Sequence, residues 1–168
     1  MARSNTHGAL AYRPLPASGA HASELFRFAG AWAPPPADVH AGWGAWDGET
    51  LVGAVLMERA GATAMLHGPV VVAPPDTPTE DVLAVAAELV SHALTHAPTV
   101  GVTTVFARPQ SLDRVWVRGG FIPVPEAELP RELQGRPGLG LFGWRGGTAL
   151  WSTAGRGGSR SALARGEH

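Results

Sequence analysis

The sequence predicts an α+β protein whose centre is a mixed, mostly antiparallel sheet of about six to seven strands with flanking helices. Two turn signals, "WDGE" and "RAGA", separate three β-rich runs at about 41–47, 50–59 and 62–73, which favours consecutive antiparallel strands. A long apolar helix and another β-rich run, "VGVTTVFARP", come next. Because a strand–helix–strand crossover favours parallel pairing, the sheet is predicted to be mixed.

The first part of the chain predicts one strand and one short helix. "GALAYRPLP" alternates up to its prolines like a strand, and "HASELFRFAGAW" has apolar side chains at helical spacing behind Ser23, a capping candidate. "PPPADV" is an extended connector, because consecutive prolines favour the polyproline conformation. Only one helix is therefore expected before the second strand.

The longest predicted helix is "TEDVLAVAAELVSHALTHA". Its apolar residues share one broad face: Val82, Val85, Ala86, Leu89, Val90, Ala93 and Leu94. Thr77 and Glu80 match a capping box around Pro78 at the first helical position, so we expect their side chains to bind the free backbone groups there.

The rest of the chain completes the sheet and ends in a tail. "QSLDRVWVRGG" predicts a short helix ended by paired glycines, and "FIPVPE" and "GLGLFGWRGG" predict the last strands. We expect one domain over residues 1–152. Residues 153–168 are a Gly/Ser/Arg tail that is too poor in apolar side chains to fold alone.

Composition excludes several classes of function. A chain of 168 residues with 45% hydrophobic content can bury one core, and a net charge of -1 gives no field that would gather nucleic acid or an anionic membrane. The absence of cysteine excludes disulfides, thiol nucleophiles and thiolate metal sites. His92 and His96 have a metal-capable spacing but no HExxH context, so no metal site is expected. The start "MARSNTHGALAYRPLP" has no signal-peptide core and no apolar run approaches a membrane span, so we expect a cytoplasmic protein.

The order of elements, the strand "GPVVVAP" leading into the long helix, and "RPQSLDRVWVRGGFIPVPE" together resemble the GNAT superfamily of acyl-CoA-dependent N-acyltransferases. In that family a glycine-phenylalanine pair closes the short helix before the sixth strand, as Gly120 and Phe121 do here. The resemblance covers about residues 9–146.

The resemblance implies that the fourth and fifth strands splay apart and that acetyl-CoA, as co-substrate, lies in the opening. The cofactor would pair with the backbone of the fourth strand and place its pyrophosphate at the start of the long helix, where unpaired N–H groups face outward. The implied cofactor-binding residues are Gly68, Val70, Val71, Val72, Thr77 and Thr79, with Arg108, Arg114 and Arg118 as charges that could meet a phosphate. A small-molecule or peptide amine acceptor would enter from the opposite side.

Two family features are replaced in this chain. The basic position of the family's phosphate turn falls on Thr77, and its glycine positions fall on Glu80 and Val82. Glu80 with Asp81 would repel a phosphate. The position at which the family often has a tyrosine that protonates the leaving thiolate falls on Trp116, whose indole is no general acid near neutral pH.

Aminolysis of a thioester needs a base for the incoming ammonium, and two residues are candidates. His67 lies in the fourth strand beside the implied splay, and an imidazole titrates near neutral pH. Glu58, in the third strand, is the other candidate. The alternatives are a half-exposed strand histidine with an ordinary hydrogen bond and a solvated strand end in "MERAG".

Three functions therefore remain open. The first is an N-acyltransferase with a degenerate pyrophosphate turn, to which we commit. The second is a catalytically inactive GNAT-like domain that binds a ligand or a protein. The third is a structural subunit that uses an apolar sheet edge, which leaves a homodimer open. With one helix before the second strand, the acceptor pocket is expected to be open and suited to a large acceptor.

Overall fold

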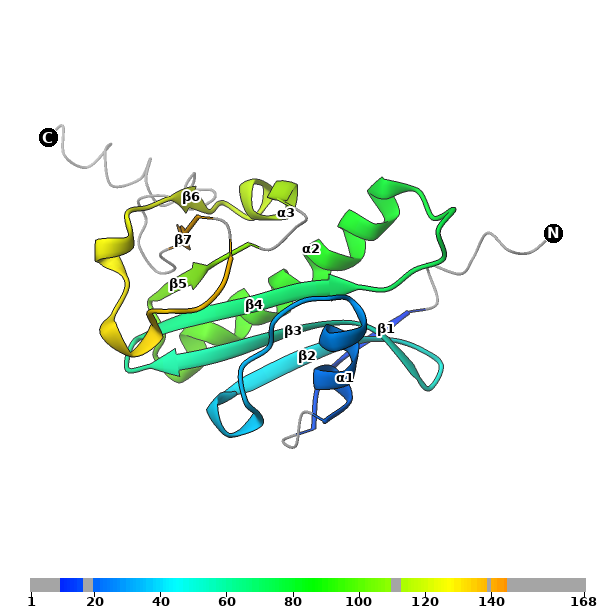
Figure 1. Cartoon of the computed structure of the whole chain (residues 1–168), viewed down its shortest axis with the longest axis horizontal. Helices are drawn as coiled ribbons and strands as arrows, with labels where there is room; N and C mark the ends of the chain where they lie inside the picture. Colours follow the sequence, from blue (N-terminus) through cyan, green and yellow to red (C-terminus); the bar gives the residue numbers. More distant parts are fainter. Residues whose placement is uncertain (1–9, 17–19, 110–112, 139, 145–168) are drawn as a thin grey trace, which may run out of the picture.

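The computed structural model describes residues 10–16, 20–109, 113–138 and 140–144, and within them the chain forms one seven-stranded sheet with helices on both faces (Figure 1). The strands are β1 (Ala11–Pro14), β2 (Ala41–Asp47), β3 (Thr50–Ala60), β4 (Thr63–Val71), β5 (Thr104–Ala107), β6 (Ile122–Pro123) and β7 (Phe142–Trp144). The helices are α1 (Ala20–Phe28), α2 (Thr79–His96) and α3 (Asp113–Arg118). Short 3-10 turns are η3 (Pro36–Asp38), η4 (Ala97–Val100), η5 (Glu126–Glu128) and η6 (Arg131–Leu133).

The sheet has the order β1-β2-β3-β4-β5-β7-β6. All neighbouring pairs are antiparallel except β4 with β5, which are parallel because α2 crosses over between them. The predicted fold class, α+β with a mixed and mostly antiparallel sheet, is confirmed.

The parallel pair β4–β5 separates halfway along β4. Its register runs from Thr63↔Thr104 to Leu66↔Ala107, where β5 ends. β4 continues from His67 to Val71, bonded to β3 on its other side. Figure 1 shows this outer half of β4 extending past β5 toward the start of α2. The sheet is therefore open on one side of β4 from His67 onward.

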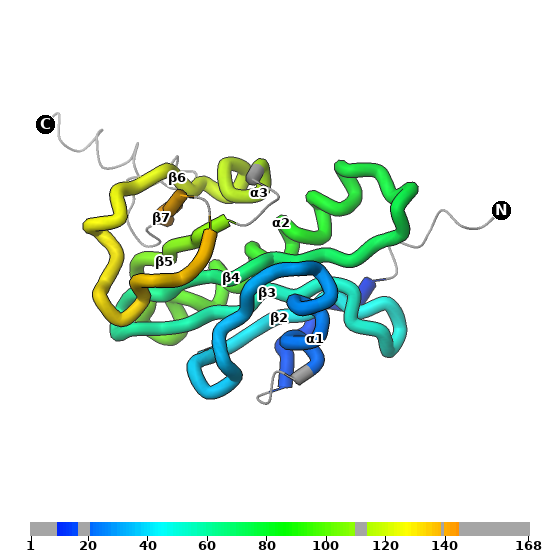
Figure 2. The backbone as a smooth tube through the Cα atoms, viewed as in Figure 1, coloured from blue at the N-terminus to red at the C-terminus, as the bar shows by residue number. Residues whose placement is uncertain are grey.

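In the described part of the chain, three apolar clusters hold helices and loops against the sheet. α2 covers one face and packs on the largest cluster, which includes Trp43, Val55 and Leu66. α1 covers part of the opposite face through Phe26 on Leu56 and Val70. Another part of that face is covered by the loop between β6 and β7, here called the 124–141 loop and described except for residue 139. Figure 2 shows this loop returning over the end of β3. Leu129, Leu133 and Leu141 of this loop pack on Met65 and Phe106.

The predicted elements agree with the observed ones, and their boundaries differ at a few ends. The three central strands were expected at about 41–47, 50–59 and 62–73, and β2, β3 and β4 match them within two residues. Ser23 is not a cap, because α1 already begins at Ala20. One α-helix, followed by η3, precedes β2 in the described part of the chain. The predicted tail, residues 153–168, lies outside the described residues.

Candidate functional site

Glu58 and His67, the two residues predicted as candidate bases, are hydrogen-bonded to each other. In the β3–β4 register Glu58 lies opposite Met65, so His67 is its diagonal neighbour on the same face of the sheet. His67 Nε2 and Glu58 Oε1 are 2.6 Å apart. The exposed fractions are 1% for His67 and 4% for Glu58, so neither is the solvated strand residue of the alternative interpretation.

Arg136 binds the same carboxylate from the loop between η6 and β7. Its Nε donates to Glu58 Oε1 at 2.9 Å, and a terminal nitrogen donates to Oε2 at 2.7 Å. Burial disfavours the charge of Glu58, but hydrogen bonds from His67 and Arg136 outweigh burial and lower the pKa of Glu58 to about 2. The carboxylate is therefore ionised at neutral pH and can only accept hydrogen bonds.

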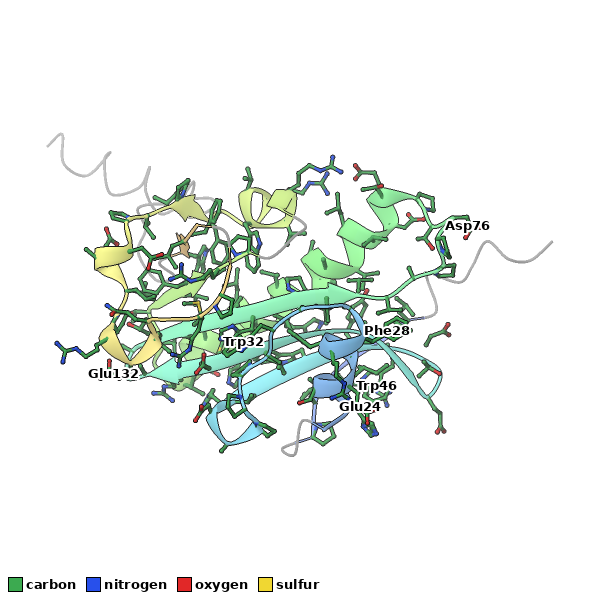
Figure 3. The ribbon with its side chains drawn as sticks, viewed as in Figure 1. Glu24, Phe28, Trp32, Trp46, Asp76 and Glu132 are labelled. Carbon is green, nitrogen blue, oxygen red and sulfur yellow. The ribbon has the colours of Figure 1, made fainter. Side chains whose placement is uncertain are left out.

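Glu58, His67 and Arg136, here called the polar cluster, lie at the boundary between two apolar clusters. Leu56, two residues before Glu58, belongs to the cluster under α1, and Met65 belongs to the cluster under the 124–141 loop. The ring of Trp32, which follows α1, meets the ring of His67 edge-on at 5.1 Å. Figure 3 places Trp32 over the central strands β3 and β4. His67 is also the first residue of β4 beyond its pairing with β5, so the polar cluster lies where the sheet opens.

The start of α2 corrects one prediction. The helix has Pro78 as its N-cap residue, with no side-chain cap, so Thr77 and Glu80 form no capping box. Glu80 instead accepts hydrogen bonds from Arg118 at 3.2 Å and from Arg114 at 3.4 Å, both in α3. The physical reason is that two cations on the neighbouring helix compete with the backbone for one carboxylate. Glu80 is thus paired with two exposed arginines instead of with the backbone.

Some of the residues predicted to bind a cofactor have backbone groups that face the open edge of β4, and others use their N–H groups in hydrogen bonds within the protein. The N–H of Val72 donates to Val52 O at 2.8 Å, so it points toward β3. Backbone groups alternate along a strand, so those of Val71 face the open side of β4. The N–H of Thr77 donates to Pro74 O at 2.9 Å. Thr79 and Glu80, in the first turn of α2, have amides with no acceptor inside the helix.

Arg108 has a carboxylate partner of its own. The guanidinium, at the end of β5, forms a bidentate pair with Glu126 of the 124–141 loop, with one N–O distance of 2.8 Å. The pair lowers the pKa of Glu126, chiefly through the hydrogen bond. A cofactor phosphate would have to replace Glu126 to reach Arg108, and that role of Arg108 remains a prediction.

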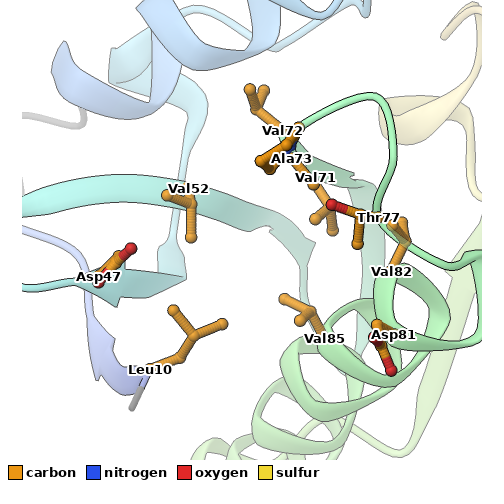
Figure 4. Close-up of a pocket in the computed structure, with 11 residues that line it drawn as sticks. Leu10, Asp47, Val52, Val71, Val72, Ala73, Thr77, Asp81, Val82 and Val85 are labelled. Carbon is orange, nitrogen blue, oxygen red and sulfur yellow. The ribbon is translucent and has the colours of Figure 1, made fainter. Parts of the chain in front are cut away.

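An apolar pocket lies beside the start of α2 (Figure 4). Val52, Val71 and Val85 form its apolar walls, and Asp47 and Asp81 add carboxylates. Its further lining residues, Leu10 among them, place it on the β1–β3 side of α2. The opening between β4 and β5 is on the other side of β4, so this pocket is separate from the polar cluster.

Two residues of the cluster were missed at the sequence level. Arg136 stands in "QGRPG" and Trp32 in "GAWAPPP", and neither segment has a periodicity or motif that marks a site. The only signal that the sequence offers for these two residues is that both lie in segments that connect predicted elements and cross the ends of strands. Tyr12 stacks on His92 of α2, on the face opposite His67. Trp116 is fully buried against Phe121, and its indole N–H has no hydrogen-bond partner among the described residues.

The fold is that of the GNAT N-acyltransferases. N-acetylglutamate synthase from Neisseria gonorrhoeae, solved with coenzyme A and L-arginine, superposes with a TM-score of 0.59 at 14% identity over 81% of this chain and 33% of the synthase. The chain thus spans about a third of the synthase's length. A GNAT-family acetyltransferase from Staphylococcus aureus Mu50 gives 0.60 at 9% identity, over 82% and 99%.

A GNAT-family N-acetyltransferase from Escherichia coli, solved in complex with CoA, gives a TM-score of 0.58 at 16% identity, over 89% of this chain and 86% of the other. No protein-family profile and no curated protein matches the sequence. At these identities the likeness establishes the fold, and the site must be argued from this chain's own residues.

The described residues contain no group of three or more histidine, aspartate or glutamate side chains able to hold a metal ion. Among the helices that the structure describes, none combines the length and apolar character needed to cross a membrane.

Proposed function

We propose that this protein is an N-acyltransferase that moves an acetyl group from acetyl-CoA to an amine acceptor. The observation that carries the proposal is the buried His67–Glu58 pair at the point where β4 leaves β5. The GNAT fold supports the class of reaction, since coenzyme A is bound in the Neisseria and Escherichia coli proteins of this fold.

The hydrogen bond assigns the proton positions on His67. Glu58 is ionised and only accepts, so Nε2 of the imidazole carries the proton of their 2.6 Å contact. In the neutral ring, Nδ1 is then the basic nitrogen. Nδ1 takes a proton from the acceptor ammonium, and the free amine attacks the thioester carbonyl. The C–S bond breaks, the thiolate takes up one proton, and the second proton of the ammonium passes to solvent.

The cofactor would lie along the open edge of β4. We assign backbone contacts to Gly68 and Val71 and a pyrophosphate contact to the amides of Thr79 and Glu80. By the alternation that turns Val71 outward, the backbone groups of Val70 face β3, so Val70 is a weaker candidate. The N–H groups of Val72 and Thr77 already donate hydrogen bonds within the protein. These N–H groups are therefore weaker candidates for a cofactor contact than the carbonyl and side-chain atoms of the same two residues.

The acceptor is an amine of small-molecule or peptide type. One neighbour is solved with L-arginine and another with N-acetylglutamate, which supports a small molecule. The presence of a single α-helix before β2 in the described residues supports a wider acceptor site, as the sequence predicts. Turnover of small amines but not of peptides would contradict the wider site. A homodimer and a cytoplasmic location remain predictions.

The test is calorimetric titration with acetyl-CoA and, in parallel, dephospho-CoA, followed by an amine screen. We expect binding in the micromolar range, and a His67→Gln variant that binds acetyl-CoA normally but has a kcat lower by about 100-fold. His92→Gln, at a half-exposed histidine of α2, is the matched control. A His67→Gln variant with unchanged kcat would remove His67 from the mechanism.

The second candidate function is an inactive domain that binds a ligand or a protein. It is favoured by Glu80 and Asp81 at the first turn of α2, where they oppose a phosphate, and by Trp116 in place of a tyrosine. If neither acetyl-CoA nor dephospho-CoA binds at millimolar concentration, this second function replaces the first.

A further inference from the structure

Arg136 is held more firmly than a surface arginine that makes a single ion pair. Besides its two bonds to Glu58, it donates to the backbone oxygens of Gln134 at 2.7 Å and Glu132 at 3.1 Å. These contacts fix the plane of the guanidinium against the carboxylate, and burial of the pair leaves 22% of the Arg136 side chain exposed.

The charge of Arg136 bears directly on His67. A buried carboxylate with an imidazole as its only partner favours the imidazolium, because the proton then neutralises the pair. In this cluster the charge of Glu58 is already balanced by Arg136, so the imidazole need not be protonated to compensate it. The other charge acting on Arg136 is that of Asp38 in η3, and Trp32, which faces His67, is uncharged.

Anchoring the loop does not by itself account for Arg136. The 124–141 loop is already attached by the Arg108–Glu126 pair and by Leu129, Leu133 and Leu141 in the apolar cluster. The loop therefore does not need a second arginine–glutamate pair to stay attached. Arg136 pairs with the buried carboxylate of Glu58, which also bonds His67, rather than with an exposed acid.

We propose that Arg136 is the positioning residue of the His67–Glu58 pair: it fixes the carboxylate that accepts from His67 Nε2 and balances its charge, so that Nδ1 is free to take the acceptor's proton. This inference rests on the proposed function for the identity of the proton donor. The charge relation between Arg136 and His67 holds without that function and can be measured alone.

The first measurement is an NMR titration of the His67 ring nitrogens, which needs no activity. In Arg136→Gln we expect the pH at which half of the His67 rings are protonated to rise by about one unit, because a neighbouring cation is lost. Glu126→Gln, which breaks the other arginine–glutamate pair of the same loop, is the matched control and should leave that pH unchanged. A folded Arg136→Gln variant with the wild-type midpoint would overturn the proposal.

The second measurement is the pH profile of kcat/KM with the acceptor found in the amine screen. Arg136→Gln should shift the acid limb upward by the same amount, with kcat/KM lower by up to about tenfold on that limb and recovery at higher pH. A purely structural loss would lower the rate at every pH and leave the limb in place, and that result would contradict the proposal.

Arg136→Lys keeps the charge and the apolar stem, so it carries the test if the glutamine variant does not fold. An ammonium lacks the planar fork that binds both carboxylate oxygens, so we expect a lower kcat with a titration midpoint within about 0.3 units of wild type. If the midpoint in Arg136→Lys rises as far as is expected for Arg136→Gln, the charge of residue 136 does not have the role proposed for it. If the wild type transfers no acyl group but the NMR shift is observed, the proposed function fails and the charge relation stands.

Discussion

Glu58 carries its negative charge where a carboxylate is ordinarily costly, and two partner side chains make this possible. Its exposed fraction is 4%, yet one oxygen accepts from His67 and both accept from Arg136. Removing one member of such a cluster leaves the others with an unpaired buried charge. The contacts on which the proposed role of His67 depends therefore also contribute to folding.

The lowered pKa of Glu58 predicts a specific acid sensitivity. Its value of about 2 in the folded protein lies below the ordinary 4.5, so the ionised form stabilises the fold above about pH 4.5, and this stabilisation is lost as the pH falls toward 2. The wild type should be more stable than Glu58→Gln at pH 6, by on the order of 3 kcal/mol, and the difference should shrink by pH 3. Urea unfolding at each pH measures it, with Glu24→Gln of α1 as a control for total charge. A difference independent of pH would show that the pair is not ionised in the folded state.

At the scale of elements, the 124–141 loop closes one side of the polar cluster and depends on close backbone packing. Gly138 has φ +152°, and a Cβ there would lie 2.2 Å from Arg108 Cγ and 2.8 Å from Arg108 O. Gly135 also has a positive φ, +84°, but a Cβ there would meet nothing within 4 Å. A comparison of alanine substitutions at the two glycines therefore separates the effect of a steric clash from the effect of a positive φ.

Gly138→Ala should destabilise the protein by about 1–3 kcal/mol more than Gly135→Ala, because only the first displaces Arg108 from its pair with Glu126. Thermal unfolding of both variants measures the difference. Equal losses would mean that the loop moves away from β5 at no cost.

The start of α2 is a second element whose charges can be tested. Glu80 pairs with Arg114 and Arg118, and these exposed pairs are worth at most about 1 kcal/mol each. Glu80→Gln should therefore change stability little, while it removes an acid from the expected pyrophosphate position and frees two arginines. We expect acetyl-CoA to bind about three- to tenfold more tightly at low salt, less so at high salt. Glu88→Gln, farther along the same helix, controls for net charge, and equal tightening in both variants would exclude a local effect.

At the scale of the whole molecule, the sheet is continuous from β1 to β4 and interrupted between β4 and β5. The interruption begins at His67, and the first turn of α2 follows the far end of β4. Figure 1 shows that this open edge and the start of α2 lie at the same end of the molecule. One extended ligand could therefore contact both.

Hydrogen exchange should detect such a ligand. Acetyl-CoA should slow exchange of the Val71 amide and of the first turn of α2, and leave the β1–β2 pair unchanged. Mass spectrometry of peptides with and without cofactor measures this. Protection confined to other segments, with binding confirmed by calorimetry, would place the cofactor elsewhere.

Local patterns were sufficient for most elements and for placing the two candidate bases on neighbouring strands. The turns "WDGE" and "RAGA" set the hairpins, and the apolar stripe of α2 determined its face, because periodicity reflects which side of an element is buried. The capping box failed because its acid had better partners in α3, which the local pattern does not contain.

The sequence by itself determined the order of strands and helices, the fold class and the presence of His67 and Glu58 on neighbouring strands. The tertiary structure alone decided that these two side chains bond each other, that Trp32 covers the imidazole and that Arg136, 78 residues from Glu58, completes the cluster. The physical reason is that secondary structure follows from short-range periodicity, whereas a bidentate ion pair depends on where a long loop comes to lie on the finished sheet.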